Sequence, residues 1–172
     1  MVDSEAESSV ALVMSKTQIV DYLVREQYEA YPYPERDPAD EHRRLLNPII
    51  DALDFLNYYG FSGKKRFEDG FDVLIAGGGT GDSTIFLAEQ LRGKPARIVH
   101  LDISAAAINI AKKRAEVRGL DNIDWIQGSI LETNHFVKQS FDYINCSGVL
   151  HHLEDPAGIT SPLINLNAVA WL

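Results

Sequence analysis

This chain of 172 residues has a single cysteine and no long apolar run, and both features exclude classes of protein. With Cys146 alone, no internal disulfide framework can form, which favours a reducing compartment. No apolar run approaches the ~20 residues that a membrane-spanning helix needs. The apolar stretch Val10–Met14 is too short for the apolar region of a signal peptide. We therefore expect a cytoplasmic, single-domain protein without a membrane partner.

Basic residues are also few, which bears on possible partners. The chain has 16 lysines and arginines against 25 aspartates and glutamates, for a net charge of −9. Non-specific binding of nucleic acid needs a basic surface, so we expect no nucleic-acid partner. The basic cluster Lys112–Arg118 is interpreted as a solvated face of a helix.

The sequence also lacks two common nucleotide-binding loops, although it has the elements that surround them. Phe71–Ala76 predicts a buried strand, glycines follow from Gly77, and Ser83–Glu89 predicts a helix. The dinucleotide pattern G-x-G-x-x-G fails, because its third glycine would fall on Asp82 or Thr84. The phosphate loop fails because no lysine follows the glycines. An aspartate at the exit of the loop favours a ligand without phosphates.

Strand-like and helical segments alternate after this loop. The helix predicted over Ala105–Arg118 has Ser104 as its N-cap and Gly119 as its stop signal. Alternation of this kind indicates a parallel, doubly wound sheet whose carboxyl ends share one edge. An acidic residue that ends the second strand, Asp102, can accept hydrogen bonds from both ribose hydroxyls. The three further strands are predicted at Arg97–Asp102, Ile123–Gln127 and Phe141–Cys146.

The G-x-G-x-G spacing of Gly77, Gly79 and Gly81, followed by Asp102, resembles the class I S-adenosylmethionine-dependent methyltransferases over about residues 71 to 158. The resemblance implies an α/β, Rossmann-like, doubly wound parallel sheet with strand order 3-2-1-4, and S-adenosyl-L-methionine as cofactor. That cofactor has no phosphate, in keeping with the loop. The segment after the fourth strand lacks [DN]-P-P-[YFW], so a small-molecule methyl acceptor is implied rather than a nucleobase or glutamine.

The resemblance also implies site residues. His152 is the candidate general base, since imidazole titrates near neutral pH; the alternative is that His151 and His152 only cap, pack or face solvent. Nine positions are candidates for contact with the cofactor: Ala76, Gly77, Gly79, Gly81, Asp102, Ile103, Ser129, Ile130 and Asn145.

Two positions depart from the family pattern. Ile75 stands where the family commonly has an acidic residue that organises the charged amino end of the cofactor, with Asp72 or Asp82 as candidate substitutes. Ser129 stands where the family often has an aspartate that accepts from the adenine amino group; a serine can still accept.

The chain is expected to divide into three parts: a disordered tail over residues 1–14, a helical lid segment over 15–62, and the cofactor-binding domain over 63–172. Ser15 and Gln18 predict a capping box, and the prolines of Tyr31–Pro34 end this first helix. A second helix is predicted from Asn47 to near Gly60. The resemblance implies that the segment covers the cofactor, with its tyrosines facing the site or packing onto the sheet.

The last residues are too few for the remaining strands of a complete family sheet. Each βαβ unit takes at least ~30 residues, and only Asp155–Leu172 remain, so we expect the C-terminal strands to be missing. The fourth strand would then be a bare edge, open to self-association or to a partner. Three functions stay open: a methyltransferase, a cofactor-binding fragment or pseudoenzyme that needs a partner, and another Rossmann-type nucleotide-binding enzyme.

Overall fold

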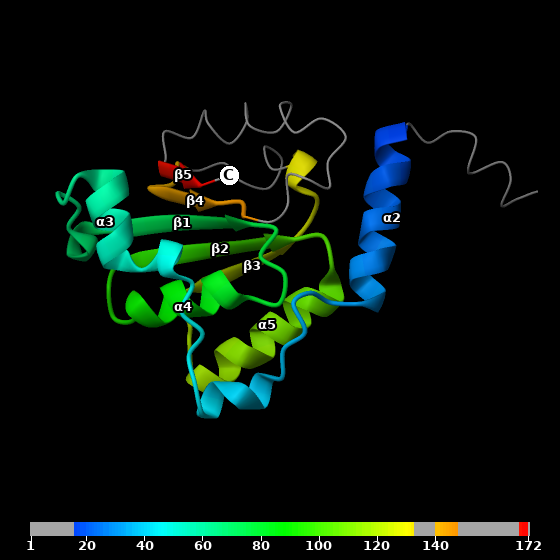
Figure 1. The fold of residues 1–172 in the computed structure, drawn as a ribbon, viewed down its shortest axis with the longest axis horizontal. Helices are drawn as coiled ribbons and strands as arrows, with labels where there is room; N and C mark the ends of the chain where they lie inside the picture. The colour runs from blue at the N-terminus through cyan, green and yellow to red at the C-terminus, as the bar shows by residue number, and fades with distance from the viewer. Residues whose placement is uncertain (1–15, 133–139, 148–168, 172) are drawn as a thin grey trace, which may run out of the picture.

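A computed structural model describes residues 16–132, 140–147 and 169–171, and its centre is a parallel sheet (Figure 1). The strand order is β3-β2-β1-β4-β5. The expected order 3-2-1-4 is therefore confirmed within a Rossmann-like sheet. The strands are β1 Phe71–Ala76, β2 Ala96–Asp102, β3 Ile123–Gln127, β4 Tyr143–Asn145 and β5 Val169–Trp171.

The fifth strand corrects the prediction for the end of the chain. β5 runs parallel to β4, with Tyr143 opposite Val169 and Asn145 opposite Trp171. Since β4 also pairs with β1, it is not a bare edge, and the prediction of association through that edge is wrong. The expectation assumed complete βαβ units, whereas a parallel crossover needs only about a dozen residues. Residues 146–168 are enough to return the chain for one further strand.

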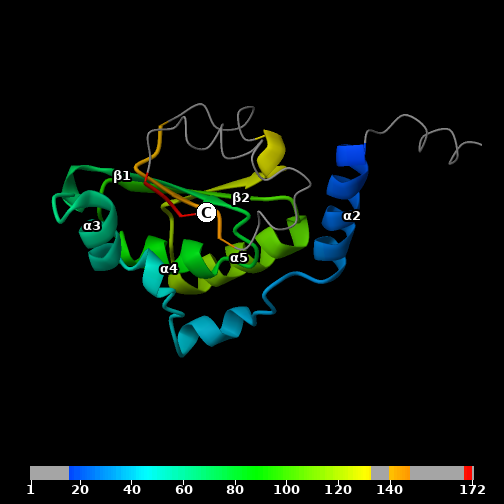
Figure 2. The ribbon, with the colours of Figure 1, turned by 45° about the horizontal axis from the view of Figure 1, so that its top comes forward.

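Helices α4, Asp82–Gln90, and α5, Ala105–Arg118, lie on the same side of the sheet, as Figure 2 shows. The chain moves from β1 to β2 to β3 in one direction, so right-handed crossovers place both connecting helices on one face. The predicted caps of α5 are confirmed. Ser104 Oγ accepts from the Ala107 amide at 3.1 Å, and Gly119 ends the helix in the left-handed conformation.

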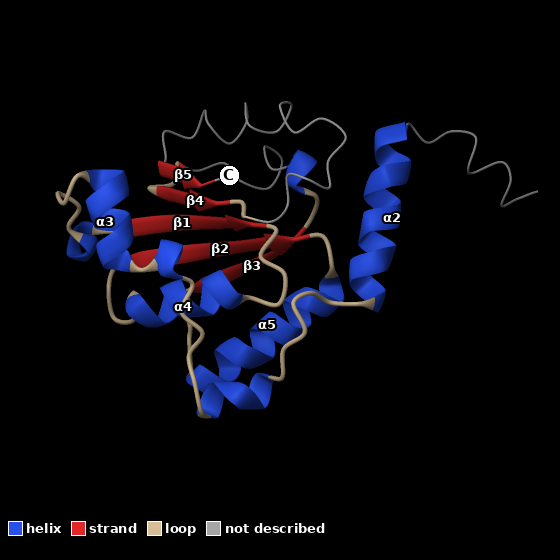
Figure 3. Cartoon of the chain, viewed as in Figure 1, coloured by secondary structure: helices blue, strands red, loops and turns tan. Residues whose placement is uncertain are grey.

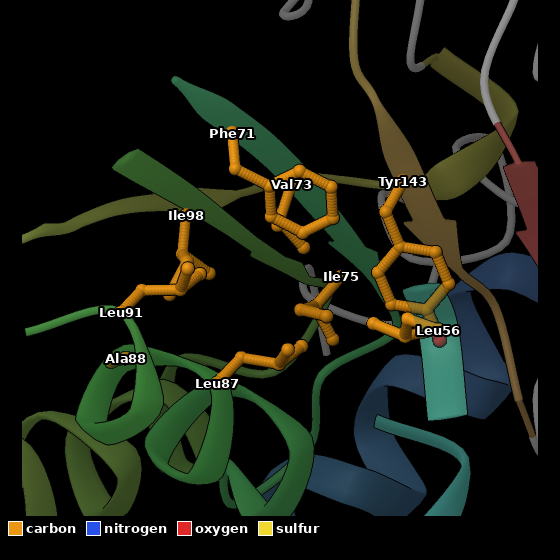
Figure 4. Packing of buried hydrophobic residues seen from close by; sticks show 9 residues of the cluster. All are labelled: Leu56, Phe71, Val73, Ile75, Leu87, Ala88, Leu91, Ile98 and Tyr143. Carbon is orange, nitrogen blue, oxygen red and sulfur yellow. The ribbon is translucent and has the colours of Figure 1, made fainter. Parts of the chain in front are cut away.

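Alternating side chains of β1 supply the cores on the two faces of the sheet. Phe71, Val73 and Ile75 point to the α4 face, whereas Leu74 and Ala76 belong to the core on the opposite face. A strand buried on both faces is typical of a central parallel strand, because each face is covered. Figure 4 shows the core on the α4 face, which consists of Leu56, Phe71, Val73, Ile75, Leu87, Ala88, Leu91, Ile98 and Tyr143.

The segment before the sheet contains helices α2, Lys16–Ala30, and α3, Leu53–Phe61. The first begins and ends close to its predicted limits. The predicted second helix is interrupted at Ala52, whose backbone is extended. The interruption occurs because Gln90 of α4 forms hydrogen bonds with backbone groups that would pair with each other in a continuous helix. The Leu53 amide donates to Gln90 Oε1 at 3.0 Å, and Gln90 Nε2 donates to the Asp51 carbonyl at 3.0 Å. The 3₁₀ helices are η1 Pro38–His42, η2 Ile49–Asp51, η3 Phe67–Asp69 and η4 Ile130–Glu132.

None of the helices in the described ranges has both the length and the apolar composition needed to cross a membrane.

Candidate functional site

Three of the predicted site residues come together at the carboxyl edge of the sheet. β1 is followed by Gly77, β2 ends at Asp102, and β4 ends at Asn145. β2 and β4 lie on opposite sides of β1, so the strand order reverses here. In open α/β sheets, ligands bind outside the carboxyl ends of the strands at such a reversal. The right-hand ends of β1 and β2 in Figure 1 mark this edge.

The glycine loop is tightly enclosed by other parts of this chain. Gly77, Gly79 and Gly81 all have positive φ, of 78°, 52° and 97°. A Cβ added at Gly79 would lie 2.5 Å from the Tyr33 carbonyl oxygen, and one at Gly81 would lie 2.8 Å from Ala111 Cβ. Glycine is therefore required at both positions by backbone conformation and by close approach.

His100 lies under this loop, and the sequence analysis did not single it out. Its ring is fully buried, and a Cβ at Gly78 would lie 2.4 Å from His100 Cε1. His100 Nδ1 is 2.8 Å from Thr84 Oγ1. Burial lowers the pKa of His100 to about 3, so the ring is neutral at physiological pH. The available signal was its place in the second strand, two residues before Asp102.

Asp102 joins the glycine loop to the start of α5. Its Oδ2 accepts from the Gly79 amide at 2.7 Å and its Oδ1 from the Ser104 amide at 2.8 Å. Burial raises the pKa of the carboxyl group, against the lowering effect of these amide hydrogen bonds. A carboxylate has about four acceptor sites, so both oxygens retain capacity for donors from a ligand.

Further predicted cofactor contacts are Ser129, Ile130, Ala76 and Ile103. The Gly128 amide donates to the Asp102 carbonyl at 2.9 Å, which brings Ser129 and Ile130 beside the end of β2. The side chains of Ile130 and Ala76 belong to the core on the face opposite α4. Ile103 is half-buried, and its carbonyl accepts from Gln127 Nε2 at 3.4 Å.

Neither candidate substitute for an acid at position 75 is available. Asp72 lies at the amino end of β1, where its carbonyl accepts from the Asp142 amide at 2.8 Å, so this prediction is wrong. Asp82 accepts two hydrogen bonds from Arg36, at 2.9 and 2.6 Å, and one from Arg114 at 2.7 Å. Burial would raise the pKa of Asp82, but these bonds and charges outweigh it and hold the pKa below its ordinary value.

Arg114 contradicts the interpretation of Lys112–Arg118 as a solvated face. Its side chain is 1% exposed and donates to Glu41 Oε1 at 2.8 Å and to the Thr80 carbonyl at 2.8 Å. Arg118 donates to the other oxygen of Glu41. The side chain is buried because η1 packs on α5 and supplies the carboxylate, a partner 73 residues away.

The segment before the sheet also contacts the predicted site. Ser104 Oγ donates to the Tyr28 carbonyl at 3.1 Å, and Thr80 Oγ1 donates to the Pro34 carbonyl at 2.6 Å. These contacts join the segment to the glycine loop and to the start of α5, and its role as a lid stays a prediction. Tyr31 and Tyr33 are 78% and 68% exposed, so the alternative in which their rings pack onto the sheet is wrong.

Asn145, at the end of β4, binds a residue that the sequence analysis missed. Its Nδ2 donates to Asp51 Oδ1 at 2.8 Å and approaches Ser83 Oγ at 3.4 Å. The Tyr143 hydroxyl donates to the same Asp51 oxygen at 2.8 Å. No motif marks Asp51, because it lies in a segment read as an ordinary helix. His152 lies outside the described residues.

Two other chemistries find no support in the described part of the chain. It contains no cluster of histidine, cysteine and acidic residues that could hold a metal ion. Cys146 is buried, which raises the pKa of its thiol to about 11. A protonated buried thiol is a poor nucleophile.

Comparison with known proteins identifies related sequences and folds. A family model described as a methyltransferase domain matches residues 67–168. The chain is 36% identical over 148 residues to an uncharacterized protein of Synechococcus, covering 85% of this chain and 33% of that protein. It is 28% identical over 137 residues to the ubiquinone biosynthesis O-methyltransferase of Acinetobacter baylyi, covering 77% and 52% of the two chains. The chain thus spans a third of one curated relative and about half of the other.

A solved structure shows the same fold. The magnesium protoporphyrin IX methyltransferase of Synechocystis PCC 6803, crystallised with bound S-adenosylmethionine, matches with a TM-score of 0.56 at 20% identity. The match covers 89% of this chain and 74% of that one.

Proposed function

This chain belongs to the class I S-adenosylmethionine-dependent methyltransferases, and on that premise we propose that it binds S-adenosyl-L-methionine and transfers its methyl group to a hydroxyl of a small molecule. The observation that carries the proposal is Asp102, a buried carboxylate at the end of β2 whose two oxygens are held by the amides of Gly79 and Ser104. This arrangement orients a pair of acceptors beside a glycine loop, as recognition of a ribose requires.

The residues at the carboxyl edge fit this cofactor. In the proposal, Gly77, Gly79 and Gly81 contact its methionine part, and Asp102 accepts from the ribose hydroxyls. The half-buried Ile103 lies along the adenine. Ser129, which follows β3, accepts a hydrogen bond from the adenine amino group. Dinucleotides are disfavoured because the loop lacks the third glycine of their pattern.

For methyl transfer, the main task of the protein is to orient the acceptor relative to the cofactor. When bound, the cofactor would supply a methyl group activated by a sulfonium: the acceptor oxygen would gain the methyl group and lose its proton, and the C–S electron pair would remain on sulfur. The chain would hold the acceptor oxygen in line with that methyl group and exclude water, which provides most of the rate enhancement in such transfers. His152 remains the candidate base for the proton.

The relatives support the class of acceptor. The curated relative from Acinetobacter baylyi is named as an O-methyltransferase of ubiquinone biosynthesis, which favours a hydroxyl on a small molecule. The net charge of −9 argues against a nucleic acid.

Isothermal titration with S-adenosylhomocysteine and with NAD tests the cofactor. We expect wild type to bind only the former, and Asp102→Asn to weaken that binding about tenfold or more, since a hydrogen bond to a charged group is lost. Asp124→Asn, at a half-exposed carboxylate of β3, is the matched control and should bind as wild type does. Binding of NAD alone would refute the proposal.

Radiolabelled methyl transfer to a panel of phenols and catechols tests the activity. Transfer that depends on Asp102 supports an O-methyltransferase. Binding of S-adenosylhomocysteine without transfer to any acceptor would instead support a cofactor-binding fragment, in keeping with a chain that spans only part of its relatives.

A further inference from the structure

Asp51 is a fully buried carboxylate with only one of its two oxygens occupied. Oδ1 accepts from the Tyr143 hydroxyl and from Asn145 Nδ2, both at 2.8 Å. Oδ2 is buried and has no hydrogen-bond partner within the described residues. The side chain is 0% exposed, so bulk water does not solvate this oxygen.

Asp51 also has no cationic partner among the residues that the structure describes. In the described ranges, no lysine or arginine forms an ion pair with it, whereas the buried Glu41 pairs with two arginines. A buried carboxylate without a cation is costly, and it normally persists where a charged or hydrogen-bonded partner completes it.

The position of Asp51 suggests that partner. Asn145, which it binds, is opposite Ile75 in the register of β1 and β4. Asn145 also approaches Ser83 in the first turn of α4, directly after the glycine loop. Asp51 therefore lies on the α4 face beside the carboxyl ends of β1 and β4, where the proposed function puts the methionine part of the cofactor.

Position 75 itself holds no acid. Ile75 is 3% exposed and packs in the apolar core with Leu56, Leu87 and Tyr143, as Figure 4 shows. The family resemblance implies a carboxylate at this position for the charged amino end of the cofactor. Asp72 lies at the amino end of β1 and Asp82 is held by Arg36 and Arg114. Asp51, in contrast, contacts Asn145, which is opposite Ile75 in the sheet.

We propose that Asp51 Oδ2 receives the ammonium group of the cofactor's methionine part and thereby replaces the carboxylate that β1 lacks. The inference rests on the proposed function, since it assigns a residue within the same site. In this chain the carboxylate comes from η2, in the segment that precedes the sheet, rather than from β1. Tyr143 and Asn145 orient its carboxylate by occupying the other oxygen.

Two ligands that differ in this ammonium group test the proposal. S-adenosylhomocysteine carries the amino-acid end, whereas 5′-methylthioadenosine has the same adenosine and thioether without it. We expect Asp51→Asn to weaken S-adenosylhomocysteine about tenfold or more and to leave 5′-methylthioadenosine within about twofold, a range below the loss of one hydrogen bond. Asp54→Asn, at an exposed carboxylate of α3, is the matched control and should change neither affinity.

The ratio of the two dissociation constants is the decisive readout, because it does not depend on the fraction of folded protein. Asp102→Asn should weaken both ligands and leave the ratio near that of wild type. An unchanged ratio in Asp51→Asn would overturn the inference and assign Asp51 to holding Tyr143 and Asn145 alone. If Asp51→Asn fails to fold, Asp51→Ser gives the same readout with a smaller polar group.

Failure of the proposed function is a separate result. It would appear as wild type binding neither ligand, which would also overturn the inference. If the inference alone fails, wild type still binds both ligands, and Asp51→Asn has the same ratio of dissociation constants as wild type.

Discussion

Two buried polar clusters join the segment before the sheet to the Rossmann-like core, and they differ in how completely their charges are paired. In the first cluster, Glu41 and Asp82 are matched by Arg36, Arg114 and Arg118. In the second, the described residues offer Asp51 the neutral donors of Tyr143 and Asn145 and no partner for its other oxygen. The matched charges of the first cluster are explained by the fold alone. The unpaired carboxylate of the second cluster, Asp51, is the group to which we assign the ammonium of the cofactor.

The largest effect is expected where the pairing is complete. Arg114→Ala removes one of the two arginines that pair with Glu41 and one of the two that pair with Asp82. We expect the free energy of unfolding, measured by urea titration, to fall by about 3–5 kcal/mol, because breaking a buried pair strands its charges.

Arg43→Ala is the control for the loss of an arginine in general. Arg43 pairs with Asp40 at the surface and its side chain is 75% exposed, so its loss should change stability by less than about 1 kcal/mol. A loss below about 1 kcal/mol in Arg114→Ala as well would show that the first cluster does not stabilise the fold.

His100 should give the next effect, as a dependence of stability on pH. Its pKa is about 3 in the folded chain and about 6.5 in an unfolded chain. Between these values the unfolded state binds the proton, so acidification through this window destabilises the fold. The slope from this residue is about 1.4 kcal/mol per pH unit.

The measurement is urea unfolding at several pH values from 7 to 5, in wild type and in His100→Gln. The variant should be less stable than wild type at pH 7 but should lose less stability on acidification. Equal slopes would show that His100 is not held neutral under the glycine loop.

The smallest change is expected at the unmatched cluster. Asp51→Asn removes a buried charge that has no cation and retains an oxygen that can accept from Tyr143 and Asn145. The free energy of unfolding of the ligand-free protein should change by less than about 1 kcal/mol or rise, since removal of an unpaired buried charge relieves a desolvation cost. A loss of 3 kcal/mol or more, as at Arg114, would abolish the distinction between the two clusters.

Much of the fold could be predicted because its signals are local. The strand Phe71–Ala76 and the helix Ala105–Arg118 with its two caps followed from an apolar run and from cap residues, and the order 3-2-1-4 was implied by the family resemblance. The glycine loop and Asp102 were identified by spacing alone. The adjacency of the loop, Asp102 and Asn145 followed from the common carboxyl edge of parallel strands.

The errors concern contacts between distant parts of the chain. Arg114 looked like part of a solvated helix face, and only the packing of η1 on α5 shows that Glu41 buries it. The short β5 has too few residues to be recognised without its pairing to β4. Residues 49–60 have a helical pattern, yet contacts with Gln90 divide it at Ala52.

The sequence by itself determined the central strand, the glycine loop and the helix caps, because periodicity, capping and motif spacing act over a few residues. The resemblance carried by these motifs implied the family and the order of the strands. Only the tertiary structure decided which charges are paired. Tyr143 and Asn145 lie 92 and 94 residues from Asp51, and Glu41 lies 73 residues from Arg114. The state of a buried charge depends on all the groups that the folded chain brings around it, and such neighbours cannot be identified from local sequence.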